Sequence, residues 1–191
     1  MNTLKFCIFF ALLCNFLTSS NAIEIKNIAS VNNYSITNFD LLQEIKIKEA
    51  LEKKKISKAQ HSFVLQIMIQ DKIKMLEIDK NKIQIPEQEI QSKLALVLDQ
   101  SFKNEEISKS LKDLIYKKIK YTSSWNILIS QKFANKLTVN MDEIDEIIKS
   151  QNLKDGERNK VIELEKNKKL NIFSKTYFNE IKKKYFIKKY L

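Results

Sequence analysis

Residues 57–98 read SKAQHSFVLQIMIQDKIKMLEIDKNKIQIPEQEIQSKLALVL, and this stretch decides the fold class. Up to about Asp79, apolar residues fall on more than one face of a helix, whereas a helix on the protein surface needs only one apolar stripe. We therefore expect a central helix at about 57–79 that contacts several neighbours. A further helix begins near Pro86, which the first turn of a helix accepts, and the acidic residues after it suit the positive end of the helix dipole.

Helical periodicity continues through most of the remaining chain. The sequence has one Gly and one Pro, a composition that fits long helices better than a sandwich or a barrel. We expect further helices at about 38–53, 113–136, 141–150 and 157–184. The residues expected to point inward are Phe39, Leu42, Ile45 and Ala50 in the first helix, and Val161, Leu164, Leu170, Phe173, Tyr177 and Ile181 in the last. The predicted fold class is mainly α, a bundle of about five to six helices.

Residues 24–36 (EIKNIASVNNYSI) lack the helical period. Apolar residues flank Asn32 and Asn33, and asparagine tolerates the left-handed conformation of a hairpin turn. We predict two short strands joined at 32–33, after which Thr37 caps the first helix. Residues 185–190 alternate enough to form a final strand, so a small β element accompanies the helices.

The N-terminal segment has the parts of a secretory signal peptide. Lys5 gives it a positive start, Phe6–Leu17 carries no charge, and small residues end at a cleavage site between Ala22 and Ile23. The apolar run is short for a hydrocarbon core of roughly 30 Å. We therefore expect residues 1–22 to be cleaved and the rest to be exported to the periplasm; retention of the segment as an anchor is the alternative.

The composition limits the chemistry of the exported chain. Both cysteines, Cys7 and Cys14, lie in the signal segment, so the rest of the sequence has no thiol for a disulfide or a metal site. A single glycine excludes Gly-rich phosphate loops. The net charge of +11 suits anionic partners, but among 34 basic residues only Arg158 is arginine, the usual residue for recognising bases and phosphates. We expect no nucleic-acid partner and attribute the lysines to AT-rich codon usage.

No group of residues predicts a catalytic centre. His61 is the sole histidine, and alone it supplies neither a metal cluster nor a nucleophile–base pair, so we interpret it as an exposed helix start. The acids Asp142, Glu143, Asp145 and Glu146 could act as catalytic carboxylates, but the first turn of a helix favours acids anyway. We expect no enzymatic activity, no metal and no cofactor.

Three residues are candidates for binding a polypeptide. Met68 and Met75 lie on the central helix, and flexible thioethers suit surfaces that accept many sequences. Trp125 lies on the long helix and could form a platform for a ligand, although core packing is the favoured interpretation of all three. The Lys-rich tail (Lys182–Lys184, Lys188, Lys189) could steer acidic chains or contact an anionic membrane, or it could be a solvated helix end.

Several stretches in this order resemble the N-terminal chaperone domain of the SurA family, periplasmic helpers of outer-membrane protein assembly. Residues 28–40 (IASVNNYSITNFD) resemble the opening of that domain, in which a V-N-x turn precedes a helix. Residues 65–98 resemble its long apolar helix and the turn that follows, here IQIPEQEI at 83–90, and a similar turn recurs at 137–148. Residues 164–191 resemble its closing helix and strand.

The resemblance implies one chaperone domain over 23–191, in which a C-terminal helix and strand at 157–191 fold back on a bundle at 23–150. The terminal strand would pair with the N-terminal hairpin. Relatives carry parvulin-type prolyl isomerase domains where this chain has only 151–156, so isomerase activity should be absent. The implied function is ATP-independent binding of unfolded outer-membrane or secreted polypeptides, without stable membrane insertion after the signal is removed. An envelope protein that docks one fixed partner and a degenerate prolyl isomerase are the alternatives.

Overall fold

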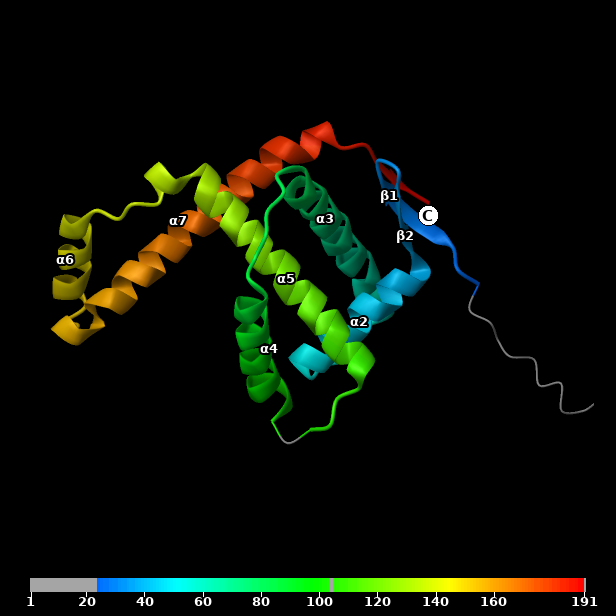
Figure 1. Cartoon of the computed structure of the whole chain (residues 1–191), viewed down its shortest axis with the longest axis horizontal. Helices are drawn as coiled ribbons and strands as arrows, with labels where there is room; N and C mark the ends of the chain where they lie inside the picture. The colour runs from blue at the N-terminus through cyan, green and yellow to red at the C-terminus, as the bar shows by residue number, and fades with distance from the viewer. Residues whose placement is uncertain (1–23, 104, 191) are drawn as a thin grey trace, which may run out of the picture.

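The computed structural model describes residues 24–103 and 105–190, so the predicted signal peptide and its cleavage site at Ala22 and Ile23 lie outside the described residues. The described part is mainly helical with a small antiparallel sheet, as the sequence predicts. Figure 1 shows the sheet at one end of the molecule and α6 at the other. The described elements are β1 (Asn27–Val31), β2 (Tyr34–Thr37), α2 (Asn38–Glu52), α3 (His61–Lys80), α4 (Glu87–Phe102), α5 (Lys109–Lys132), α6 (Met141–Ser150), α7 (Arg158–Ile181) and β3 (Ile187–Lys189).

The two ends of the described chain meet in the sheet. Its strand order is β2-β1-β3, and both neighbouring pairs are antiparallel. The hairpin turns at Asn32, whose φ of 51° lies in the left-handed region that asparagine tolerates. Val31 lies opposite both Tyr34 of β2 and Ile187 of β3. The predicted hairpin and its predicted pairing with the C-terminal strand are therefore confirmed.

Helix α2 begins at the predicted cap. The Thr37 hydroxyl accepts a hydrogen bond from the backbone N–H of Asp40 at 3.1 Å, and the Asp40 carboxylate accepts one from the backbone N–H of Thr37 at 2.8 Å. This reciprocal capping box satisfies two N–H groups that the first turn would otherwise leave without partners. The cap thus fixes where strand β2 ends and the helical body begins.

The buried face of α2 differs from the predicted one. Phe39 and Leu42, predicted to point inward, are 44% and 40% exposed, whereas Ile45 and Ile47 are buried. The reason is that α2 serves two clusters in succession. Its first turns lie beside β2 and α3, and Ile47 packs with residues of α4 and α5. The contact face therefore rotates along the helix, and one straight stripe does not describe it.

Helix α3 lies at the centre of the largest apolar cluster, as its several apolar faces predict. It contacts α2, α5 and β1. The cluster is formed by Leu65, Ile69, Ile73 and Ile78 of α3, Ala29, Val31 and Ile36 of the sheet, Trp125, Leu128 and Ile129 of α5, and Tyr177 and Ile181 of α7. Burial of this apolar surface is the main force that joins both ends of the described chain to the middle.

Two smaller clusters extend the molecule on either side of this core. One joins α2, α4 and α5, and the other joins α6 to the first half of α7. The buried members are Ile47, Leu94, Phe102 and Ile115 in the former and Ile144, Ile148 and Val161 in the latter. Since α5 and α7 each take part in two clusters, these long helices connect the three parts of the fold.

Two further predictions need correction. Helix α5 begins at Lys109, not near residue 113, because the Ser108 hydroxyl caps it by accepting a hydrogen bond from the N–H of Leu111 at 3.3 Å. Leu164 of α7, predicted to point inward, is more than half exposed. It lies between Val161, which packs with α6, and Phe173, which stacks on Phe133. At that point along α7 neither neighbour covers it.

Candidate functional site

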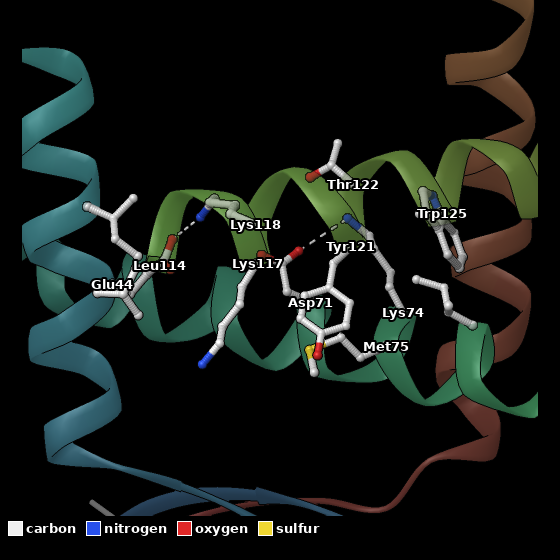
Figure 2. Close-up of a pocket in the computed structure, with 12 residues that line it drawn as sticks. Glu44, Asp71, Lys74, Met75, Leu114, Lys117, Lys118, Tyr121, Thr122 and Trp125 are labelled. Atoms are coloured by element: carbon white, nitrogen blue, oxygen red, sulfur yellow. Dashed lines mark hydrogen bonds and ion pairs between the residues drawn. The ribbon is translucent and has the colours of Figure 1, made fainter. Parts of the chain in front are cut away.

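A groove runs between α3 and α5, and α2 closes one of its ends (Figure 2). Its volume is about 230 Å³. The lining residues are Glu44 and Ile47 of α2, Asp71, Lys74, Met75 and Ile78 of α3, and Leu114, Lys117, Lys118, Tyr121, Thr122 and Trp125 of α5. Small-molecule sites usually occupy roughly 300–1,000 Å³, so this hollow by itself has room for only one or two side chains of a larger partner.

Helical spacing explains why these residues converge. The four lining residues of α3 stand at positions i, i+3, i+4 and i+7, which fall on one face of a helix. The lining residues of α5 repeat steps of three and one from Leu114 to Trp125 and likewise form a single stripe. Figure 2 shows the side chain of Tyr121 beside that of Met75, with Asp71 close to both. Two facing stripes, each part apolar and part charged, thus make the groove.

Trp125 belongs to the core and borders the groove. It is 4% exposed, its indole N–H donates a hydrogen bond to the Ser174 hydroxyl of α7 at 2.8 Å, and its ring stacks on Tyr177 with centroids 5.8 Å apart. These contacts fix the ring at the end of the groove nearest to α7. As a candidate binding residue, Trp125 can therefore offer only part of its surface.

The two candidate methionines lie along one continuous depression. A second hollow of about 310 Å³, bordered by Met68, Ser35 and Ile36, adjoins the groove. The two hollows share Met75 and the carboxylates of Glu44 and Asp71. Met68 and Met75 are both half-buried and stand seven residues apart, which places them on the same face of α3. The depression therefore extends from β2 to α5, and we refer to both hollows together as the α2–α3–α5 groove.

Charged side chains surround this apolar floor. Lys118 forms an ion pair with Glu44, and Lys74 forms one with Asp71 at 3.4 Å. The Lys74 ammonium also lies 5.9 Å from the centroid of the Trp125 ring, within range of a cation–π attraction. Lys117 is exposed and forms no ion pair among the described residues. With three lysines and two carboxylates around it, the first hollow carries a net positive charge.

A buried carboxylate lies elsewhere on α3. Glu77 is 6% exposed and accepts hydrogen bonds from the hydroxyls of Tyr177 at 2.5 Å and Tyr185 at 3.0 Å, and from the amide of Asn81 at 3.2 Å. Burial acts to raise the pKa of Glu77, but the three hydrogen bonds outweigh it and the pKa lies below the ordinary value. Both carboxylate oxygens of Glu77 thus have hydrogen-bond partners. We infer that this cluster holds α7 and the C-terminal segment against α3.

Three of the four acidic residues of α6 lie at its first turn or in an ion pair. Asp142 and Glu143 occupy the first turn, where Asn140 caps the helix, and Asp145 forms an ion pair with Arg158. His61 begins α3, as predicted, although it is half-buried. Within residues 24–103 and 105–190, no three His, Cys, Asp or Glu side chains come together as metal ligands would.

Most of the groove was not predicted from the sequence. Met68, Met75 and Trp125 were predicted as binding residues, whereas Tyr121 and the lysines of α5 were not. The signal was present in part, because residues 114, 117, 118, 121, 122 and 125 have the spacing of one helix face. That spacing shows which residues share a face and does not show that the facing helix leaves a hollow there.

No protein-family model matches the chain, and no curated protein sequence matches it. Over the part of the chain that the structure describes, none of the helices is both long and apolar enough to cross a membrane. The α2–α3–α5 groove and the charges around it are therefore the features from which a function can be inferred.

Proposed function

We propose that this protein is an ATP-independent chaperone that binds unfolded polypeptides through the α2–α3–α5 groove. The observation that carries the proposal is the groove itself, an open depression whose floor contains Met68, Met75 and Tyr121. The resemblance of the sequence to the SurA family supports the same function. Outer-membrane or secreted polypeptides in the periplasm are the clients that this resemblance and the predicted signal peptide favour.

The floor of the groove suits binding with low sequence specificity. Methionine has three rotatable bonds and a polarisable sulfur, so Met68 and Met75 can adapt to client side chains of different shape. Tyr121 adds a rigid aromatic surface beside them. Complete burial of one client Leu, Phe or Met side chain contributes roughly 1.5–3 kcal/mol. One or two such side chains per groove give reversible binding, which a chaperone needs in order to release its client.

The charges favour rapid capture. Lys74 and Lys118 are paired with Asp71 and Glu44, so their charges balance. Lys117, which is exposed and also lines the groove, adds one positive charge in excess. The excess positive charge attracts acidic stretches of an unfolded chain and raises the rate of encounter. Since exposed charges are screened by salt, the association rate should fall as ionic strength rises.

Suppression of aggregation tests the proposal. A urea-unfolded outer-membrane protein is diluted into buffer with a several-fold excess of the purified protein, and light scattering is followed. We expect less scattering in its presence, without added nucleotide. No change in scattering at any excess would contradict the chaperone function and would leave the fold unaffected.

Cross-linking separates a chaperone from a protein that docks one fixed partner. A photo-reactive residue at position 121 lies in the groove, and the same residue at position 96 lies on the exposed surface of α4. Several unrelated unfolded polypeptides, each added separately, should cross-link to position 121 and not to position 96. Cross-linking to a single partner only, in a fixed stoichiometry, would favour the docking protein.

A further inference from the structure

The sheet has an outer face that the core does not use. Ala29, Val31 and Ile36 turn toward the core and are almost completely buried. Because side chains alternate along a strand, Ser30 points to the other face, directly opposite Lys188 of β3. Phe186 and Tyr190 flank β3 at the same two-residue spacing, which places them on that face with Lys188.

Contacts on this outer face agree with the alternation. The Lys188 ammonium lies 4.8 Å from the centroid of the Tyr190 ring, and the Tyr190 hydroxyl lies 3.4 Å from the Ser30 hydroxyl. Lys189, in contrast, donates a hydrogen bond to Gln66 of α3 at 3.2 Å and so points to the core side. Lys188 and the two aromatic residues therefore form one surface, which we call the aromatic sheet face.

Phe186 is held in place although it is exposed. Its side chain is 70% exposed, the largest value among the described large apolar residues. Its N–H donates to the Asn32 side-chain oxygen at 2.9 Å, and its carbonyl accepts from the Asn32 N–H at 2.7 Å. The ring is therefore presented from a fixed backbone beside the hairpin turn. Core packing does not account for a phenylalanine in this position.

Lysines precede and follow Phe186 along the chain. Lys182, Lys183 and Lys184 form a single 3₁₀ turn just before it, and all three are exposed. A carboxylate oxygen of Glu180 lies 4.0 Å from the ammonium of Lys184. Between residues 180 and 190, five lysines thus stand against one carboxylate.

We propose that the aromatic sheet face docks onto the surface of a membrane that contains anionic phospholipids. Aromatic side chains are stable at the boundary between headgroups and acyl chains, while lysines attract the phosphates. The charge of the face is complementary to such a surface. Phe186, Lys188 and Tyr190 do not line the α2–α3–α5 groove, although Ser35, which pairs with Ser30, borders its second hollow. Docking through β3 therefore leaves the first hollow, between α3 and α5, free for a polypeptide. The protein would then hold its client close to a membrane.

A tryptophan reporter tests this placement. The single natural tryptophan, Trp125, is buried and gives a constant background. In the full chain, Phe186→Trp places a second indole on the aromatic sheet face. The matched control Leu96→Trp places it on a similarly exposed apolar position of α4, since the two residues are 70% and 60% exposed. Each variant is mixed with vesicles of equal parts phosphatidylglycerol and brominated phosphatidylcholine, whose bromine atoms quench an indole that enters the bilayer.

We expect the emission of the Phe186→Trp variant to shift to the blue and to be quenched, and that of the Leu96→Trp variant to stay unchanged. Changing Lys182, Lys183 and Lys184 to Gln should lower vesicle affinity by about a hundredfold, at roughly fivefold for each lysine near an anionic surface. Equal quenching at both positions would show attachment through another part of the chain and overturn the proposal. It would also be overturned by an unquenched Phe186→Trp variant, or by equal quenching on brominated phosphatidylcholine alone.

Discussion

Replacement of Tyr177 by Phe should lower the free energy of unfolding by about 2 kcal/mol, since a hydrogen bond to a charged group contributes roughly 1.5–3 kcal/mol. The lost hydroxyl donates to the Glu77 carboxylate at 2.5 Å, and Glu77 is almost completely buried. The ring remains, so its stacking contact with Trp125 is kept and the change reports the hydroxyl alone. Urea unfolding followed by circular dichroism measures the difference.

Tyr34→Phe is the matched control, because it removes the same atom from a side chain that is about half exposed. We expect it to change the free energy of unfolding by less than about 0.5 kcal/mol, as most surface substitutions do. If Tyr177→Phe costs no more than Tyr34→Phe, then the carboxylate of Glu77 does not link the C-terminal helix to α3 and the reasoning fails.

The cost of Tyr177→Phe should also depend on pH. Burial and the hydrogen bond to Glu77 both raise the pKa of Tyr177 in the folded state, and the same causes raise the pKa of Tyr185 to about 12. Their stabilising contribution is complete below the ordinary tyrosine pKa of 10.0 and is lost as pH rises through the folded value. The pKa of Glu77 is lowered, so its contribution is complete above the ordinary 4.5 and is lost as pH falls through the folded value.

The difference in unfolding free energy between wild type and Tyr177→Phe should therefore be constant from about pH 5 to pH 10 and smaller on both sides. Urea unfolding at a series of pH values measures it. A difference that stays the same from strongly acidic to strongly alkaline pH would show that neither group titrates with the fold.

Two further substitutions test the core and the helix start. Ile69→Ala in the main cluster should lower the free energy of unfolding by about 3 kcal/mol, since such truncations cost roughly 2–5 kcal/mol. Phe63→Ala, at an exposed position of the same helix, should lower it by less than about 0.5 kcal/mol. Equal losses for the two variants would contradict the position of the core. Thr37→Ala should lower the free energy of unfolding by about 1 kcal/mol because it removes the cap of α2, and Thr37→Ser should restore most of this loss. Urea unfolding measures both variants. A Thr37→Ala variant as stable as wild type would rule out the capping box.

Local sequence signals predicted the elements well. Asn32 predicted the hairpin because few residue types tolerate its left-handed conformation, and Thr37 predicted the start of α2 because its side chain can cap a helix. Burial was predicted less well. Phe39 and Leu164 have the spacing of inward residues, yet about half of each remains exposed. Whether a helix face is buried depends on which elements pack beside it, and a single helix does not contain that information.

The candidate site was predictable only in part, for a similar reason. Met75 was identified because methionine suits adaptable surfaces, and it lies in both hollows of the groove. Tyr121 was missed because its importance comes from facing Met75 across two helices. Glu77 gave no signal at all, since a glutamate in a helix normally faces water, and its burial depends on two tyrosines about a hundred residues later in the chain.

The most direct test of the central claim is the affinity of a labelled, permanently unfolded polypeptide for wild type, Met75→Glu and Leu96→Glu, measured by fluorescence anisotropy. The two variants carry the same change in charge, one inside the groove and one on the exposed surface of α4. Circular dichroism shows whether each variant is folded. Tyr121→Ala, a second change in the groove, shows whether binding also weakens without an added charge. Loss of the contact with Met75 should weaken binding at least about tenfold, because one buried apolar side chain contributes roughly 1.5–3 kcal/mol and 1.4 kcal/mol is tenfold in affinity. Leu96→Glu should bind like wild type. Equal affinities for all the folded variants would contradict the assignment of polypeptide binding to the α2–α3–α5 groove.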